Sequence, residues 1–218
     1  RGWLESRSRV WDDFMGDLKL LEKNKLYYEA IEGLTDIECF NYWVKELKEN
    51  GFLHNHTRMW FASIWIFTLN LPWQLGAEFF LKYLTDADTA SNTLSWRWVA
   101  GIQTKGKNYL AKNWNIEKFT NGKFSPAILN ENALPVSDSR NYTFSKINYS
   151  DLETISESVV MFENELNTDF LDNSNYKHAY FCLLSNDERQ VEISQKNMIY
   201  KESVVDNLTK EVSCNVRK

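Results

Sequence analysis

Residues 54–67, HNHTRMWFASIWIF, place two histidines, an asparagine and an arginine directly before the most apolar run of the chain. A helix over residues 53–70 would be apolar on nearly every side, which predicts that it is buried in a core. Arg58 stands near the head of that helix. A buried charge is costly unless a partner compensates it, so the sequence should supply an acid elsewhere.

The segments on both sides of this run also have helical spacing. Gly33 is placed to end one helix, and Asp36 is placed to cap the next. Proline cannot continue a helix, so Pro72 ends the apolar one. Helical segments are predicted within residues 3–31, 36–50, 53–70, 73–84 and 88–100. Residues 1–130 are therefore predicted to form an all-α bundle.

The character of the chain changes after this bundle. Residues 131–155 are rich in Ser and Asn and are predicted to be a linker. Residues 156–218 contain two apolar runs, 158–162 and 178–184, that are typical of buried strands. The predicted fold class is mainly α, followed by a short segment that starts a small α/β domain.

The composition restricts the class of protein. The chain has 218 residues, 43% hydrophobic, which is enough for a core. The three cysteines are far apart and form neither a disulfide framework nor a metal motif, so we expect a reducing, cytoplasmic location. The apolar run 59–69 is too short to span a membrane, so we expect no membrane partner. The chain begins with Arg1, and we expect it to be part of a longer protein.

The net charge of −5 is unevenly distributed. Within residues 97–123 there are six cations and one anion. Such a basic stretch can contact phosphates, and we assign this role to Lys105, Lys107 and Lys112. On charge alone, a solvated lysine-rich surface explains the stretch equally well.

A metal site is the first alternative for the polar residues. His54, His56, Asp86 and Asp88 are all possible ligands. Residues two apart on a helix point about 200° away from each other, so neither pair converges on one ion. We therefore predict no metal site.

Helical spacing favours a different grouping. Asn55, Arg58 and Met59 share one helical face, and Asp88 and Asn92 share another. An arginine prefers a carboxylate that matches its planar fork, and Asp86 or Asp88 could supply it. Such a pair could meet a polar heteroaromatic ligand. A purely structural ion pair remains an alternative at this point.

Four longer motifs resemble one known family. They are GFLHNHTRMWFAS (51–63), LPWQLGAEFF (71–80), LTDADTASNTLSWRWVAG (84–101) and KFTNGKFSP (118–126). In order and spacing they resemble the flavin-binding helical domain of the photolyase/cryptochrome family, over about residues 10 to 130. The resemblance implies FAD as cofactor and a helical bundle of that family's type.

The resemblance also implies roles around the flavin. Arg58 and Asp86 are similar to the ion pair over the flavin ring, and Asp88 to the acid at its pyrimidine edge. Asn92 is similar to the residue that faces flavin N5, and Asn55 to the one at the boundary with substrate. Trp96 and Trp73 resemble the inner two members of an electron-transfer chain. Met59 and Trp98 resemble residues of the lesion pocket, and Trp11 is assigned to substrate binding with them.

The implied function is FAD-dependent, light-driven repair of pyrimidine dimers, with damaged DNA as partner. Two alternatives are a cryptochrome-like blue-light photoreceptor without repair activity and a helical binding module without flavin. Departures from the family pattern keep them open: Leu20 stands where the distal tryptophan is expected, and the lesion-contacting acid and arginine fall near Ser8 and Asp12. The family's phosphate clamp and antenna domain would lie upstream of this chain.

Overall fold

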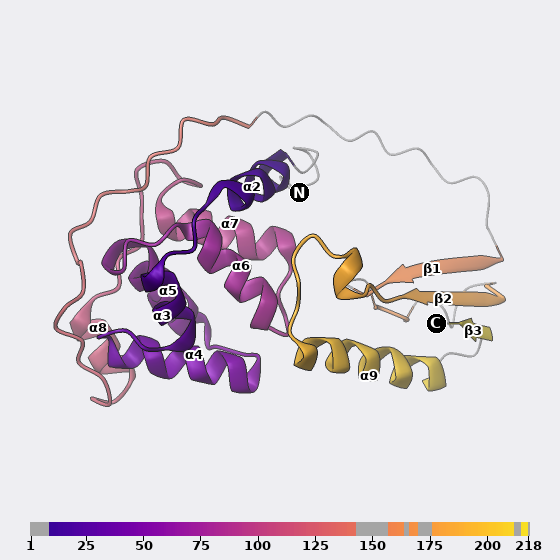
Figure 1. Cartoon of the computed structure of the whole chain (residues 1–218). Coiled ribbons are helices and arrows are strands. Elements are labelled where there is room, and N and C mark those ends of the chain that lie inside the picture. Colours follow the sequence, from indigo (N-terminus) through magenta and orange to yellow (C-terminus); the bar gives the residue numbers. More distant parts are fainter. Residues whose placement is uncertain (1–8, 143–156, 164–165, 170–175, 212–214, 218) are drawn as a thin grey trace. The chain divides into compact units, whose positions relative to one another are not determined.

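The computed structural model describes residues 9–142, 157–163, 166–169, 176–211 and 215–217. The chain divides into two compact units between residues 146 and 147. We call them the helical unit and the α/β unit (Figure 1). The predicted fold class, mainly α with a short α/β segment after it, is confirmed.

The helical unit is built from short helices around an aromatic core. The large rings at its centre, which include Phe61, Trp65 and Trp96, are at most 2% exposed. Burying such rings contributes a large share of the stability of a core. The helices are α2 (Arg9–Leu20), α3 (Lys25–Glu32), α4 (Glu38–Asn50), α5 (Asn55–Ser63), η1 (Ile64–Thr68), α6 (Trp73–Tyr83), α7 (Thr89–Ala100) and α8 (Asn113–Phe119).

Glycines end several of these helices as predicted. Gly33 and Gly51 follow α3 and α4 with φ of 66° and 69°, a left-handed conformation that glycine adopts without steric cost. The predicted cap at Asp36 is wrong, because α4 begins without a capping side chain. Thr35 and Asn41 order this loop instead: the Asn41 amide donates to the Thr35 carbonyl at 2.6 Å and accepts from its hydroxyl at 2.7 Å.

The predicted helix over 53–70 is interrupted by a π-turn. After α5, the Leu69 N–H donates to the Ile64 carbonyl at 2.9 Å, five residues back. In this wider turn Trp65 is fully buried, and its indole N–H donates to the Pro72 carbonyl at 2.9 Å. Such turns are frequent at functional sites. The apolar run is buried as predicted.

The first part of the predicted linker lies against the helices. We call residues 131–142 the strap. Asp138 accepts from Arg97 at 3.3 Å, and Tyr142 donates to Asp13 at 2.8 Å. Arg97 is 4% exposed, and a buried charge of this kind requires a carboxylate partner. The composition of the strap alone does not reveal that it supplies this partner. The rest of the predicted linker, 143–155, lies outside the described residues.

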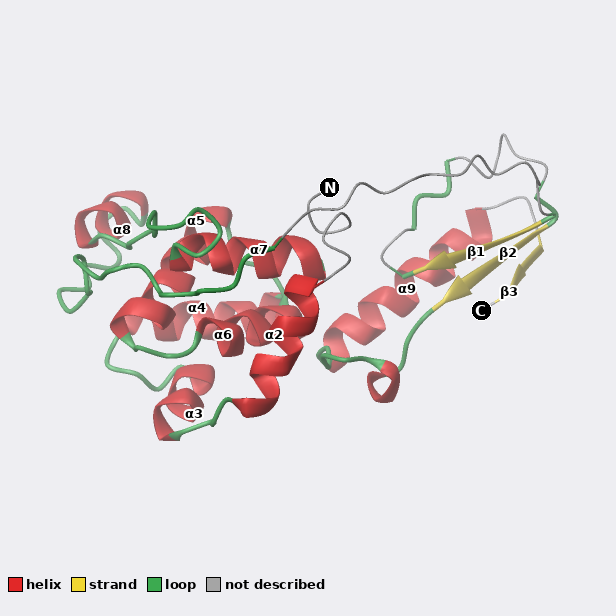
Figure 2. Ribbon diagram, turned by 90° about the horizontal axis from the view of Figure 1, so that it is seen from above, coloured by secondary structure: helices red, strands yellow, loops and turns green. Residues whose placement is uncertain are grey.

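The α/β unit contains a three-stranded parallel sheet in the order β1-β2-β3. The two predicted strands are present, and the sequence reading missed α9 and β3. Helix α9 runs along one face of the sheet (Figure 2) and buries Met161, Ala179, Phe181 and Val205. The elements are β1 (Ser158–Phe162), β2 (His178–Cys182), η2 (Asn186–Glu188), α9 (Gln195–Glu211) and β3 (Asn215–Arg217).

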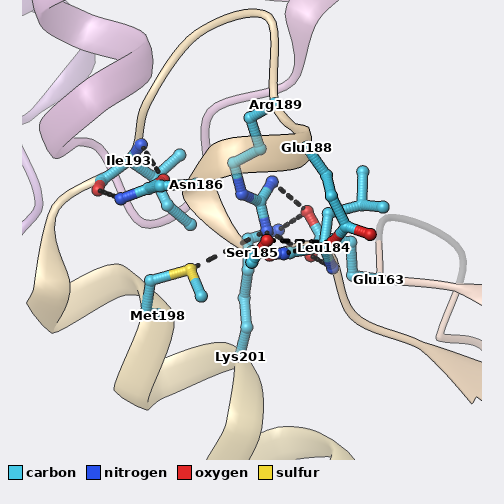
Figure 3. A network of polar contacts seen from close by, with 9 residues as sticks. All are labelled: Glu163, Leu184, Ser185, Asn186, Glu188, Arg189, Ile193, Met198 and Lys201. Atoms are coloured by element: carbon cyan, nitrogen blue, oxygen red, sulfur yellow. Dashed lines mark hydrogen bonds and ion pairs between the residues drawn. The ribbon is translucent and has the colours of Figure 1, made fainter.

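A buried ionic network closes the carboxyl end of this sheet (Figure 3). Glu163 follows β1, is 4% exposed at its side chain, and accepts two hydrogen bonds of 2.5 Å from Arg189. Lys201 of α9 lies 3.2 Å from the same carboxylate. The Leu184 N–H, just after β2, also donates to Glu163, at 3.3 Å. One carboxylate therefore ties the ends of both strands to α9 and to the connection before it.

None of the helices in the described ranges is long and apolar enough to cross a bilayer.

Candidate functional site

One cavity of about 260 Å³ in the helical unit gathers most of the predicted site residues. Its walls come from α5, from the end of α6 and the loop that follows, and from α7. The lining side chains that we had predicted as site residues are Asn55, Arg58, Met59, Asp86, Asp88, Asn92, Trp96 and Trp98. Motifs that lie up to 43 residues apart in the sequence therefore meet at one site.

The predicted ion pair between Arg58 and Asp86 is present at this cavity. Arg58 Nη2 donates to both carboxylate oxygens of Asp86, at 3.1 and 2.9 Å, and its Nε donates to the Leu53 carbonyl at 2.8 Å. The expectation of a buried charge is wrong, because the two side chains are 24% and 55% exposed. An ion pair as exposed as this contributes little to folding stability. Because the pair is not enclosed by the core, the Arg58 guanidinium is accessible to a ligand in the cavity.

Asp88, the other predicted partner of Arg58, has a structural role. Its carboxylate accepts from the Ser91 N–H at 2.7 Å and so caps α7. The cap fixes the start of the helix that carries Asn92 and Trp96. Asp88 also lines the cavity, so its position is set by the cap while part of its carboxylate faces the site.

Asn92 is the buried polar side chain of the cavity wall, at 8% exposed. Its amide nitrogen donates to the Ala77 carbonyl in α6 at 3.0 Å. This contact fixes the side chain and uses one of its two N–H groups, so the amide oxygen and the second N–H are left for a ligand. Buried amides are held in one orientation by such bonds.

Trp96 forms an apolar part of the cavity and packs into the core behind it. Its ring centroid lies 5.1 Å from that of Phe80, edge-on. The ring covers Gly76 in α6 so closely that a Cβ there would lie 2.3 Å from Trp96 Cη2. The Trp96 indole nitrogen is buried and has no hydrogen-bond partner among the described residues. An unpartnered buried donor beside a cavity is a place where a ligand acceptor would be favoured.

The remaining predicted residues at the cavity lie on its rim. The Asn55 amide nitrogen lies 4.0 Å from Met59 Sδ, one turn along α5. Trp98 is 40% exposed and stacks on Tyr109, with centroids 5.8 Å apart and rings tilted by 25°. These side chains therefore offer an amide, a thioether and an aromatic face where the cavity meets solvent.

Five predicted site residues do not line this cavity: Trp73, Trp11, Lys105, Lys107 and Lys112. Trp73 is 4% exposed and packs on Phe14 at 5.6 Å, and Trp11 also packs on Phe14, at 5.1 Å. Trp73 instead borders a second, more open cavity beside the strap.

The basic stretch is only partly a free surface. Lys105 donates to Asn141 at 2.7 Å, and Lys112 bonds to the Glu131 carbonyl and lies 3.8 Å from its carboxylate. Both lysines thus contact the strap. Arg97, counted with them from the sequence, is buried against Asp138. Lys105, Lys107, Lys118 and Lys123 of this stretch are exposed.

Sequence reasoning missed several residues near the cavity. Gly76 could have been found from its place between large apolar residues in a predicted helix, where glycine is unfavourable unless a side chain needs the space. Nothing in the sequence distinguished Trp65 from the apolar residues around it. Sequence reasoning also did not single out Trp114 and Phe119 of α8, which are exposed on the surface at 61% and 54%.

The chemistry of the cavity suits a flat heterocycle with polar edges. Phe80, Leu84 and Val99 offer apolar walls, while Arg58 and Asn92 offer a cation and an amide oxygen. Pockets for organic ligands combine such walls with a few fixed polar groups. The volume accommodates a ring system and not a whole dinucleotide, so the rest of a dinucleotide would lie outside it. A flavin ring fits these residues. No group of three or more metal-ligating side chains occurs in the described part of the chain.

Comparison with known proteins finds similarity over part of the helical unit. Residues 27–125 match the family described as FAD binding domain of DNA photolyase. The deoxyribodipyrimidine photo-lyase of Streptomyces griseus is 42% identical over 72 residues, which are 33% of this chain and 16% of that protein. The deoxyribodipyrimidine photo-lyase of Agrobacterium fabrum is 33% identical over 97 residues, 44% of this chain and 20% of that protein.

A cryptochrome is among the similar proteins as well. Cryptochrome DASH of Idiomarina loihiensis is 30% identical over 102 residues, 45% of this chain and 22% of that protein. The chain thus spans between 16% and 22% of the length of these three relatives. No solved structure matches the chain significantly.

Proposed function

Because residues 27–125 belong to the FAD-binding domain of the photolyase/cryptochrome family and FAD is the cofactor of that domain, we propose that the protein repairs pyrimidine dimers in DNA by light-driven electron transfer. The observation that carries the proposal is the cavity itself. It brings Arg58, Asp86, Asn92 and Trp96 together with the rim residues that the family resemblance assigns to the lesion.

Bound FAD supplies the light-driven one-electron chemistry, and the protein supplies position and electrostatics. Asn92, fixed by its bond to the Ala77 carbonyl, would offer its amide oxygen to a bound flavin. Arg58, held by Asp86 and the Leu53 carbonyl, places a positive charge beside it. That charge stabilises negative charge in the cavity. The apolar side chains Phe80, Leu84 and Val99 exclude water from the ring face.

The rim residues are proposed to meet the damaged base. A dimer inside a duplex is out of reach of the cavity, so it has to be flipped out of the stack. The exposed ring of Trp98 and the side chains of Asn55 and Met59 offer stacking and polar contact at the mouth of the cavity. Lys107 is the predicted phosphate contact best placed to act, because it is exposed, whereas Lys105 and Lys112 contact the strap.

A repair assay tests this proposal. The purified protein with FAD is incubated with a dimer-containing oligonucleotide, in blue light and in the dark. We expect loss of dimers in the light only, and much less loss with Trp98→Ala. Equal dimer content in light and dark, with FAD bound, would contradict repair.

A photoreceptor without repair activity is the second candidate. It is favoured by the strap contacts of Lys105 and Lys112, because these two cations then have a structural partner and not DNA. In the same assay, a photoreceptor would bind FAD and respond to light by a change in the flavin spectrum while leaving the dimers intact.

A further inference from the structure

Trp96 is the end of a series of aromatic rings that runs away from the cavity. Its centroid lies 6.3 Å from that of Trp65, with the rings nearly perpendicular at 85°. Gly76 is the reason that they come so close. A Cβ at residue 76 would be 2.3 Å from Trp96 Cη2 and 3.0 Å from Trp65 Nε1, so these two atoms converge on the same small space.

The series continues from Trp65 to the surface. Trp65 meets Tyr27 edge-on at 6.1 Å, and Tyr27 meets Tyr28 at 5.3 Å. Exposure rises along the way: Trp65 and Trp96 are at most 2% exposed, Tyr27 is 7% exposed, and Tyr28 is 54% exposed. Four oxidisable side chains therefore form consecutive ring contacts from the cavity to solvent. The π-turn at 64–68 carries Trp65, the member that joins Trp96 of α7 to Tyr27 of α3.

Trp73 does not continue from Trp96 in the same way. Its ring contact in the described part of the chain is with Phe14, whose ring is much harder to oxidise than that of tryptophan or tyrosine. The guanidinium of Arg97 also lies 5.9 Å from the Trp73 ring. Arg97 is paired with Asp138, so Phe14 is the feature that interrupts a route through Trp73.

Charge along the first route is compensated at its outer end. Lys23 Nζ lies 5.4 Å from the Tyr27 ring, but it is paired with Glu78 at 3.1 Å. Tyr28 is half exposed, so its hydroxyl proton can pass directly to water. An oxidised tyrosine that loses this proton is neutral and is not repelled by a neighbouring cation.

We propose that Trp65, Tyr27 and Tyr28 form an electron-donor path to Trp96. The proposal rests on the proposed function, because the oxidant is photoexcited oxidised flavin bound in the cavity. One electron leaves Trp96 for that acceptor. It is replaced in steps from Trp65, Tyr27 and finally Tyr28, while the Tyr28 hydroxyl releases its proton to water. The neutral Tyr28 radical is then reduced by a thiol in solution, which supplies one electron and one proton.

The test uses spectroscopy of the radical and not repair. Protein with FAD is illuminated without thiol, frozen, and examined by electron paramagnetic resonance. We expect a tyrosyl signal in the parent protein, its loss in Tyr28→Phe, and slower flavin photoreduction by added thiol in Tyr27→Phe and Tyr28→Phe. Tyr42→Phe is the matched control, since Tyr42 is 44% exposed and lies outside the path.

The outcomes separate the path from the proposed function. Flavin absorbance of each sample is measured first, and a parent protein that binds no flavin contradicts both claims. A flavin-loaded protein with an unchanged signal in Tyr28→Phe contradicts the path alone. So does loss of photoreduction in Trp73→Phe when both tyrosine variants behave like the parent.

Discussion

Gly76 lies beneath the ring of Trp96, where a Cβ would be 2.3 Å from Cη2 and 2.5 Å from Cζ3 of that ring. Gly76→Ala is expected to destabilise the helical unit by about 1–3 kcal/mol, because the core cannot accept the extra methyl without moving Trp96. Denaturant unfolding followed by tryptophan fluorescence measures this. Gly16→Ala is the control: nothing lies within 4 Å of a Cβ there, and in helix α2 alanine should stabilise by up to about 1 kcal/mol. Equal stabilisation by both variants would contradict the steric argument.

Arg58 is expected to matter for FAD and little for folding. Its pair with Asp86 is partly exposed, so Arg58→Ala should cost less than about 1 kcal/mol of unfolding free energy. FAD affinity should fall clearly, and Arg58→Lys should restore only part of it, because lysine lacks the fork. Lys48→Ala is a matched control, since the Lys48–Glu32 pair has side chains 24% and 58% exposed and neither residue lines the cavity. If the Arg58→Ala protein bound FAD as tightly as the parent protein, Arg58 would not be part of the FAD site.

The strap is expected to detach in acid. Burial alone would raise the pKa of Asp138, but hydrogen bonds from Arg140 and the charges of Arg140 and Arg97 lower it below its ordinary value. A lowered pKa in the folded state means stability that is present above the ordinary Asp pKa and is lost as pH falls through the lowered one. Hydrogen exchange of residues 131–142 should therefore accelerate below about pH 4.

Asp138→Asn should produce the same loosening at neutral pH. Removing one partner of a buried pair costs about 3–5 kcal/mol, and the two side chains here are 5% and 6% exposed. Protection of the strap amides in this variant, after correction for the intrinsic exchange rate at each pH, should no longer fall over the pH range in which Asp138 would be protonated. A slow-exchanging strap in Asp138→Asn would mean that other contacts hold it.

Glu163→Gln is expected to destabilise the α/β unit by about 3–5 kcal/mol, because it removes the charge of the buried carboxylate that Arg189 and Lys201 share. All nine tryptophans lie at or before residue 114, so tryptophan fluorescence reports on the helical unit. We expect faster hydrogen exchange in α9 and an unchanged fluorescence transition. Unaltered exchange in α9 would show that the network is dispensable.

The sequence predicted most of the helical unit because its patterns are local. Helical spacing and glycine positions located the helices, and Arg58 could be matched to a carboxylate 28 residues away because a charge near a core requires one. The cap at Asp36 was wrong because Asn41 competes for the same loop through its side chain. Spacing alone does not reveal that competition.

The errors elsewhere have a common cause, which is contact between distant segments. Arg97 was counted as a surface cation because its partner, Asp138, lies 41 residues later in a segment with the composition of a linker. Trp65 gave no sign of its role, since the space over Gly76 of α6 exists only where Trp65 of η1 and Trp96 of α7 meet. Helix α9 carries many polar residues, and its apolar contacts appear only against the sheet.

The central claim is that the cavity between α5 and α7 binds the flavin ring of FAD, and titration of the purified, flavin-free protein with FAD tests it most directly. We expect saturable binding with a structured flavin absorbance spectrum, and weaker binding when Asn92 is changed to Leu, which removes the amide oxygen at similar volume. A protein that shows no saturable FAD binding, or an Asn92→Leu variant that is folded and binds as tightly as the parent, would contradict the account.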